Sequence, residues 1–135
     1  EVDRKVIVVI TDGVDEGSRK TREDAIQAAL KADTVIYSIL YEDRSAYGGF
    51  GGGGGEGELR RMSGDTGGRV FRVDRKSSLE DAFRDLQEEM RTQYAIAYAP
   101  TNDKKDGTFR KIEIRAASKD DKVQTRKGYY AEPPN

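Results

Sequence analysis

A run of five aliphatic residues, Val6 to Ile10, constrains the fold of this chain more than any other feature. No polar residue alternates with the aliphatic ones, which is typical of a strand buried on both faces of a parallel sheet between helices. Thr11, Asp12 and Gly13 follow and end the strand. Asp12 is therefore predicted at the carboxyl edge of the sheet, where open α/β sheets bind ligands. Asp15 and Glu16 come close behind it.

The next residues predict the crossover connection of a parallel sheet. A helix is expected over residues 21–32, capped by Ser18 or Thr21 and with one apolar face, formed by Ile26, Ala29 and Leu30. An apolar strand is expected over residues 34–41. Strand, helix and strand at this spacing are typical of a right-handed crossover. The predicted fold class is therefore α/β, with a Rossmann-like parallel sheet and flanking helices.

Two more helices and another strand are predicted further along. Residues 48–57 contain eight glycines without the spacing of a phosphate-binding loop, so we interpret them as a surface loop, with a ligand cradle as the alternative. A short helix over 58–63 and a strand over 69–73 follow. The clearest helix is predicted over 78–91, with a capping box of Ser77 and Glu80. Its apolar stripe is interpreted as core: Leu79, Ala82, Phe83, Leu86 and Met90.

After residue 93 the apolar period changes from helical to alternating. Tyr94, Ile96 and Tyr98 alternate with alanines, and apolar residues alternate with charged ones over 112–116. With a last strand over 123–130, they predict an antiparallel set that has one solvated face. We interpret residues 1–100 as the parallel α/β part and residues 101–135 as an antiparallel β tail that continues the same domain.

The composition excludes several kinds of site. The 135 residues include no cysteine and no histidine, which excludes disulfides, thiolate zinc sites and Ser-His-Asp or Cys-His catalysis. A bound metal would need oxygen ligands, which suit Mg²⁺, Mn²⁺ and Ca²⁺. Lys and Arg total 24 against 25 Asp and Glu, so no positive excess favours a nucleic-acid partner. No apolar run approaches the roughly 20 residues that span a bilayer, so membrane insertion is not expected.

The order of these elements, together with local motifs, resembles the carboxy-terminal part of a von Willebrand factor A (VWA) domain. The motifs are VIVVITDGVDEGS, ADTVIYSILY and ELRRMSGDTGGRVFRV. The closing stretch, from LEDAFRDLQEEMRTQYAIAYAPTN to VQTRKGYYAEP, is similar to the bacterial subgroup often called VWFA-related proteins. In that subgroup the A domain runs on into an antiparallel tail that ends in a basic-Gly-Tyr-Tyr signature. The resemblance covers residues 5–132.

This resemblance implies a non-catalytic module for protein binding or cell adhesion. In the family, a divalent ion at the carboxyl edge of the sheet, in the metal-ion-dependent adhesion site (MIDAS), captures an acidic side chain of a protein partner. The matching residue here is Asp12, with Asp15, Glu16 and Ser18 as candidate supporting residues around the ion. Mg²⁺ or Mn²⁺ is expected in preference to Ca²⁺. The family also suggests a periplasmic or extracellular location.

The predicted metal site is incomplete in this chain. The D-x-S-x-S motif and the threonine of the family's site have no match, and the amino-terminal part of the domain is expected to be absent. The nearest stretch, DRSAY at 43–47, has a tyrosine in place of the second serine and follows the wrong strand. One carboxylate supplies few of the roughly six oxygen ligands that such an ion prefers, so weak binding is expected. The alternatives are that Asp12 satisfies turn amides or acts as a phosphoacceptor or general base.

Without the family's first strand, residues 5–10 are expected to form an edge of the sheet. A flat aliphatic edge recruits another strand, so self-association or pairing with the chain's own tail is expected. Three functions follow in order of preference: a binding or adhesion module, a metal-independent scaffold that assembles through strand edges, and a phosphotransfer or hydrolytic enzyme. Four tyrosines are interpreted as strand packing, with a partner surface as the alternative: Tyr94, Tyr98, Tyr129 and Tyr130. Arg115, Arg126 and Lys127 are interpreted as the polar face of the tail.

Overall fold

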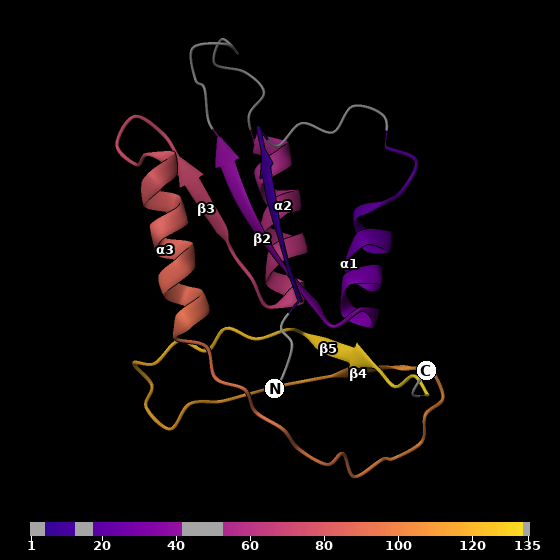
Figure 1. The fold of residues 1–135 in the computed structure, drawn as a ribbon. Coiled ribbons are helices and arrows are strands. Elements are labelled where there is room, and N and C mark those ends of the chain that lie inside the picture. The colour runs from indigo at the N-terminus through magenta and orange to yellow at the C-terminus, as the bar shows by residue number, and fades with distance from the viewer. Residues whose placement is uncertain (1–4, 13–17, 42–52, 134–135) are drawn as a thin grey trace.

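The computed structural model describes residues 5–12, 18–41 and 53–133, which form a mixed α/β fold (Figure 1). Its elements are, in chain order, β1 (Lys5–Thr11), α1 (Arg22–Lys31), β2 (Thr34–Tyr41), α2 (Gly53–Thr66), β3 (Val70–Val73), α3 (Leu79–Arg91), β4 (Phe109–Lys111) and β5 (Gly128–Tyr130). The first three strands form a parallel sheet, and β4 and β5 form a separate antiparallel pair. The predicted fold class is confirmed: a parallel sheet with flanking helices, followed by an antiparallel carboxy-terminal segment.

Strand β2 lies at the centre of the parallel sheet, whose order is β1-β2-β3. β1 pairs with it along the whole length of both apolar runs, with Ile7 opposite Ile36 and Ile10 opposite Ile39. From Thr34 to Leu40 the side chains of β2 are buried, apart from the half-buried Val35. An uninterrupted apolar strand therefore occupies the position where both faces are covered, as its pattern predicts.

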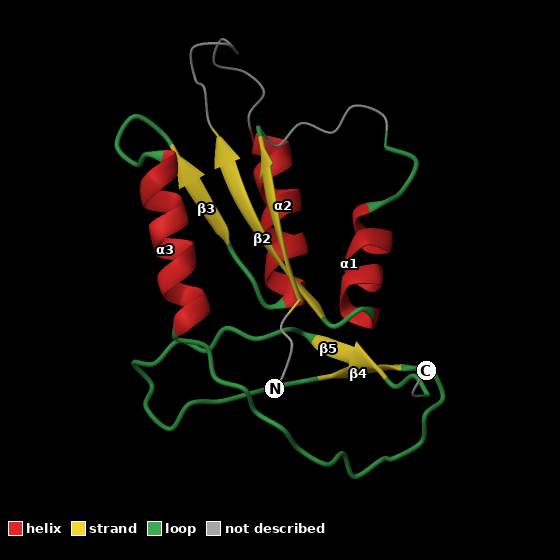
Figure 2. Ribbon diagram, in the orientation of Figure 1, coloured by secondary structure: helices red, strands yellow, loops and turns green. Residues whose placement is uncertain are grey.

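Helices cover the two faces of the sheet unequally (Figure 2). On one face, α1 and α2 pack against β2, where the hydroxyl oxygens of Ser38 and Ser63 lie 2.9 Å apart. The hydroxyl of Thr66 also accepts a hydrogen bond from the Ile36 amide at 3.0 Å. On the opposite face, α3 packs over β3. The main apolar cluster lies there and comprises Tyr37, Ile39, Phe71, Val73, Ala82 and Leu86.

Strand β1 is not buried on both faces, so the prediction from its continuous apolar run is wrong in this respect. Ile7, Val8 and Ile10 are exposed by 50%, 37% and 55%. Within the described residues, no strand pairs with the outer side of β1, and α3 lies over β3, at the other side of the sheet. Strand β1 is therefore an edge strand, as the incomplete resemblance predicts.

The apolar stripe of α3 is core only in part. Ala82 and Leu86 are buried, whereas Leu79, Phe83 and Met90 are each exposed by about 40%. The helix rests on the short strand β3 and makes few contacts with the rest of the sheet. The apolar stripe of α3 is therefore wider than the part of the sheet that it covers, and its uncovered side chains are exposed to solvent.

Helix α2 is longer at both ends than the sequence predicts. It begins at Gly53, inside the glycine-rich stretch that predicts a surface loop, and it ends at Thr66 instead of near residue 63. Residues 42–52 lie outside the described part of the chain. Glu56 pairs with Arg60 one turn later and with Arg72 of β3, and Leu59 and Ser63 are buried. These contacts offset the helix-breaking tendency of glycine, about 1 kcal/mol per residue relative to alanine.

Two glycines end α2 and connect it to β3. Gly67 has a φ of +98°, a left-handed conformation that side chains disfavour and that commonly ends a helix. Gly68 passes so close to β2 that a Cβ atom would lie 2.1 Å from the carbonyl oxygen of Ile36. The turn thus depends on both residues being glycine.

Helices α1 and α3 both begin with a capping box. In α1, the hydroxyl of Thr21 accepts a hydrogen bond from the Asp24 amide, so Thr21 is the cap and Ser18 is not. In α3, the box is formed by Ser78 and Asp81, one residue later than the predicted Ser77 and Glu80. The reason is that Ser77 closes the turn after β3, since its amide donates to the carboxylate of Asp74 at 2.9 Å.

The tail contains less strand than predicted. Strand β4 pairs antiparallel with β5, but it covers residues 109–111 and not 112–116. Residues 94–99 form no strand, and Tyr94 is 92% exposed. Alternating apolar residues form a strand only where a partner backbone and a covering surface are available. In the described part of the chain, no strand pairs with this segment.

The tail is held to the amino-terminal ends of the sheet strands by backbone and charged contacts (Figure 1). The amide of Lys127 donates to the carbonyl of Asp65 at 3.0 Å, and its ammonium lies 2.5 Å from the Asp65 carboxylate. Arg126 pairs with Asp33, and Arg115 pairs with Glu113 within the tail. Arg126 and Lys127 therefore connect the tail to the parallel sheet and its helices, whereas Arg115 is only part of the polar surface.

Candidate functional site

The carboxyl edge of the parallel sheet carries two described aspartates. Asp12 directly follows β1 and is exposed, and Asp74 directly follows β3. The carboxylate of Asp74 accepts hydrogen bonds from the amides of Lys76 and Ser77, at 2.7 and 2.9 Å. Asp74 therefore closes the turn into α3, and Asp12 occupies the predicted position at the end of β1.

The described residues do not by themselves make a metal site. Asp12 and Ser18 are exposed, whereas Asp15, Glu16 and the DRSAY stretch at 43–47 lie outside the described part of the chain. Among residues 5–12, 18–41 and 53–133, no three carboxylates come together in a way that could hold an ion. One described carboxylate at the strand end fits a divalent ion poorly, since such ions prefer about six oxygen ligands.

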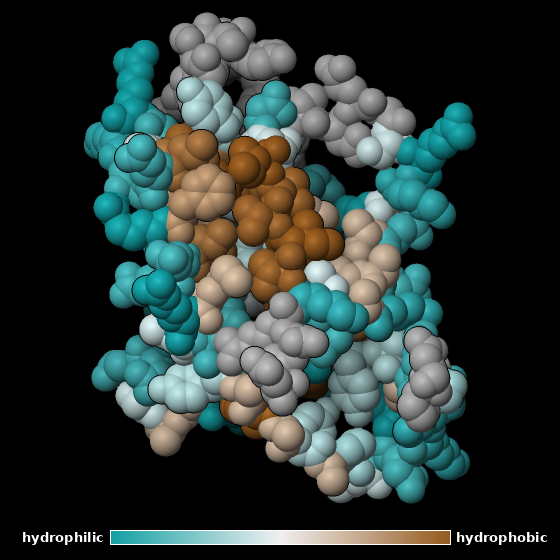
Figure 3. Space-filling model, viewed as in Figure 1, coloured by the Kyte–Doolittle hydropathy of each residue, from teal (hydrophilic) through white to brown (hydrophobic). Residues whose placement is uncertain are grey.

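An uncovered apolar surface lies on the side of β1 that shares a face with the main core cluster (Figure 3). We call Val6, Val8 and Ile10 the apolar face of β1. Val6 packs against the core cluster, whereas Val8 and Ile10 are substantially exposed. Tyr41 of β2 and Phe83 of α3 are also exposed, by 54% and 43%. Contiguous apolar patches of this kind mark interaction surfaces.

The four tyrosines of the tail differ in whether they pack within the tail, as predicted, or are exposed as a partner surface would be. Tyr94 is almost fully exposed, and Tyr98 is 57% exposed. A hydrogen bond between the hydroxyl groups of Tyr98 and Tyr129 raises the pKa of Tyr98. Tyr130 packs on Phe109, with ring centroids 5.2 Å apart. The tyrosines at 129 and 130 therefore take part in tail packing, whereas Tyr94 contributes nothing to the core.

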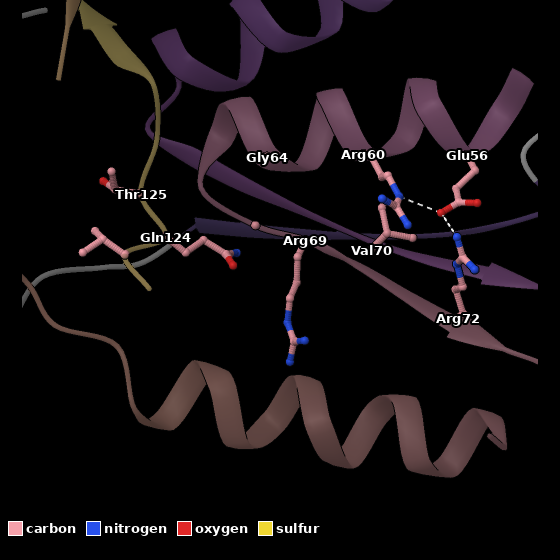
Figure 4. A pocket seen from close by; sticks show the side chains of 10 residues that line it. Glu56, Arg60, Gly64, Arg69, Val70, Arg72, Gln124 and Thr125 are labelled. Atoms are coloured by element: carbon pink, nitrogen blue, oxygen red, sulfur yellow. Dashed lines mark hydrogen bonds and ion pairs between the residues drawn. The ribbon is translucent and has the colours of Figure 1, made fainter. Parts of the chain in front are cut away.

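A groove of about 460 Å³ lies on the opposite side of the sheet from β1, between α2, β3 and residues 123–125 of the tail (Figure 4). Three arginines line it: Arg60 on α2, Arg69 directly before β3 and Arg72 on β3. Val70 and Val123 supply apolar surface between them. Its volume lies within the range of about 300–1,000 Å³ that is typical of ligand pockets.

Ion pairs fix the arginines of this groove. The carboxylate of Glu56 lies between Arg60, at 2.6 Å, and Arg72 (Figure 4). The hydrogen bond from Arg72 is the main cause that lowers the pKa of Glu56, and Arg60 adds to it. Arg69 pairs with Glu89 of α3 and stacks on the Phe71 ring, 4.4 Å from its centroid. The groove is thus a fixed, charged surface.

Comparisons with known proteins identify no family. No family model matches the chain, and no curated protein matches it. A solved structure described as an uncharacterized membrane spanning protein from Vibrio fischeri is similar over 67% of this chain, with 20% identity and a TM-score of 0.47. This chain spans 47% of the length of that protein. Among the helices that the structure describes here, none is long and apolar enough to cross a membrane.

The sequence predicts the position of Asp12 after β1 and the edge position of β1, but it does not predict the groove. Residues 123–125 lie 51 to 65 positions after Arg60, Arg69 and Arg72 in the sequence, and no motif connects them. The alternation of Arg69, Val70, Phe71 and Arg72 is the available signal, because it places Arg72 on a short strand and Arg69 directly before it. Only the packing of α2 and the tail beside β3 turns this strand into one wall of a groove.

Proposed function

We propose that this chain is a non-catalytic protein-binding module of the VWA type, and that its partner contacts the apolar face and outer edge of β1. The observation that carries the proposal is the exposure of Val8 and Ile10 on a strand that, among the described residues, has a neighbour on one side only. The α/β fold agrees with the one that the resemblance implies.

Two physical effects favour binding at β1. Burying an aliphatic side chain of this size stabilises a complex by about 1.5–3 kcal/mol when the whole side chain leaves water, and proportionally less for a half-exposed one. An edge strand also presents main-chain donors and acceptors that an added strand can satisfy. A partner that supplies both a strand and an apolar surface would use both effects.

The proposed binding does not depend on a metal ion. Asp12 stands at the end of the same strand, so an ion held there by further ligands would lie beside the partner surface and would capture an acidic side chain. The described residues bring no group of three carboxylates together that could hold such an ion. Metal-dependent capture of an acidic side chain is therefore a variant of the proposal. The crosslinking experiment described next distinguishes it from metal-independent binding.

The test places a photoreactive benzoylphenylalanine at position 10 of the chain. The matched control carries it at Ile114, an aliphatic residue of the tail that is 37% exposed. In extracts of cells that produce the protein, we expect position 10 to crosslink to a discrete partner. Excess unlabelled chain should compete for this crosslink, whereas the Ile10→Lys variant should not.

The outcomes distinguish the candidate functions. A crosslink at position 10 to a second copy alone would identify a scaffold that assembles through β1. Loss of the crosslink with a chelator and with Asp12→Ala would identify metal-dependent capture, and calorimetric titration with Mg²⁺ and Mn²⁺ would measure the ion directly. Equal labelling from positions 10 and 114 would overturn the assignment of β1 as the partner surface.

A further inference from the structure

We propose that an amphipathic helix of a partner protein packs beside α3, on the face of the sheet that carries Val8 and Ile10. Such a helix would be the segment of the partner that covers β1, and assigning it rests on the function proposed above. We call Val8, Ile10, Leu79 and Phe83 the β1–α3 surface. Figure 3 shows the hydrophobic side chains that gather over the strands beside α3.

The sheet supplies the floor of the β1–α3 surface. Val8 lies opposite Tyr37 in the parallel register, and the next pair on this face is Ile10 with Ile39. Residues opposite each other in a sheet point to the same face. Tyr37 and Ile39 are fully buried in the core cluster, which includes Leu86 of α3, whereas Val8 and Ile10 are exposed. The cover that α3 gives to this face therefore ends between β2 and β1.

Helix α3 supplies the wall of the β1–α3 surface. Its residues Asp85 and Glu88 lie on the same side as Arg69, which also lines the groove at the outer side of β3. Because an α-helix turns by about 100° per residue, Leu79 and Phe83 lie on the other flank of α3, towards β1. They are exposed by 42% and 43%. The uncovered part of the α3 stripe and the uncovered part of the sheet therefore border the same space.

This space has the dimensions of one helix. Helix α3 lies over β3, and β1 is two strands away, which is about 10 Å at the usual spacing of strands. Packed helices have their axes about 8–10 Å apart, so a helix over β1 would contact α3 along its flank. The 7 residues of β1 extend over about 23 Å, which a helix of about 14 residues would cover.

The exposed polar residues of α3 beside Phe83 predict the charges of the partner helix. Glu80, Gln87 and Arg91 follow one another along this flank, in the first turn, the middle and the last turn. All three are exposed. A neighbouring helix would complement them with a basic side chain at the end near Glu80 and an acidic one at the end near Arg91. Its apolar residues would recur at spacings of three and four.

A second copy of this chain fits the β1–α3 surface less well than a separate helix does. In a symmetric face-to-face pair, the outer side of α3 from one copy would cover β1 of the other. That side carries Arg84 and Arg91, which are both exposed. Pressing these charged groups against Val8 and Ile10 would remove them from water at a cost in free energy. The helix is therefore assigned to another protein.

The experiment measures binding of a fluorescein-labelled peptide of about 14 residues by anisotropy at low salt. A hydrocarbon staple keeps the peptide helical, leucines form its apolar stripe, and it has Lys at one end and Glu at the other. We expect Ile10→Lys and Phe83→Lys each to weaken binding about tenfold or more. Ile7→Lys is the matched control, because Ile7 is 50% exposed on the opposite face of β1 and should affect binding little. Circular dichroism checks that all three variants are folded.

The charge pattern is tested with two more stapled peptides, one with Lys at both ends and one with Glu at both ends. In either orientation on the surface, each has one mismatched end and should bind about twofold to fivefold more weakly than the mixed peptide. The disadvantage of the peptide with two Glu ends should disappear in Glu80→Gln. Equal binding of all three peptides to the unmodified chain would overturn the placement of the helix beside α3.

The outcomes distinguish this helix site from the function on which it rests. If position 10 crosslinks to a partner but the mixed peptide binds Phe83→Lys as well as the unmodified chain, β1 remains the partner surface and the helix beside α3 is overturned. If position 10 forms no specific crosslink and the peptide does not bind, both are overturned. Dimerisation of the chain alone that Phe83→Lys abolishes, measured by sedimentation, would assign the surface to a second copy and overturn the partner helix.

Discussion

At the residue scale, alanine substitutions of two glycines near the end of α2 are expected to have opposite effects on stability. We expect Gly68→Ala to destabilise the protein by about 1–3 kcal/mol, because its Cβ would overlap the Ile36 carbonyl and the backbone would have to shift. Gly64 lies within α2, and a Cβ there would meet no atom within 4 Å. Gly64→Ala is therefore expected to stabilise the protein by about 1 kcal/mol through helix propensity.

Urea denaturation of the two variants beside the unmodified chain measures both effects. Similar changes in the free energy of unfolding would contradict the close approach of Gly68 to β2. The pair is informative because the chemical change is the same and only the surroundings differ.

The raised pKa of the buried Tyr37 hydroxyl predicts how the stability of the protein changes at alkaline pH. Burial raises its pKa to about 12 from an ordinary value of 10, and the carboxylate of Glu89 adds to the shift. The folded protein then keeps the phenol proton at pH values where the unfolded chain has lost it. The resulting contribution to stability is fully present below pH 10 and is lost as the pH rises from about 10 towards 12.

Tyr37→Phe is expected to be less stable at pH 8, because the hydrogen bond from Gln93 to the Tyr37 hydroxyl is lost, and to lose less further stability between pH 9 and about 11.5. Tyr94→Phe is the control, since Tyr94 is 92% exposed. Its stability should follow that of the unmodified protein across this range. Parallel pH profiles for all three proteins would contradict the role given to Tyr37.

At the element scale, the start of α3 tests which serine is the cap. Ser78→Ala should destabilise the protein by about 1 kcal/mol, because the hydroxyl of Ser78 accepts a hydrogen bond from the Asp81 amide at 3.1 Å. Ser77→Ala should have little effect, since the turn uses the backbone of Ser77. Thermal unfolding of both variants measures the difference, and a larger loss for Ser77→Ala would restore the capping box predicted from sequence.

The elements also show where sequence patterns suffice. The strands β1, β2 and β3 and the helices α1 and α3 were predicted within a few residues, because each has a long apolar period or a capping residue of its own. Helix α2 was predicted too short, since its first turn contains glycines and is held by Glu56 through Arg60 and Arg72. The alternation over 94–98 predicts a strand that does not form, because a pattern does not show whether a partner strand exists.

At the scale of the whole molecule, the open edge of β1 predicts how hydrogen exchange depends on concentration. We expect the amides of Val6 to Ile10 to exchange more slowly as the protein concentration rises, because a second chain would cover them. The amides of β2 should be protected at all concentrations, since that strand is central. Fast exchange over Val6 to Ile10 at every concentration, in a protein that stays monomeric by sedimentation, would show that this edge tolerates exposure.

Patterns in the sequence are enough to predict the α/β class, the parallel crossover, the antiparallel tail and the position of Asp12 at the carboxyl edge of the sheet. These follow from periodicity and chain connectivity, which act over neighbouring residues. The exposure of Val8 and Ile10 is visible only in the folded chain, and so is the groove in which Arg60, Arg69 and Arg72 meet the tail. Both features depend on which distant segments cover a surface, and burial is a property of the packed chain that no local pattern contains.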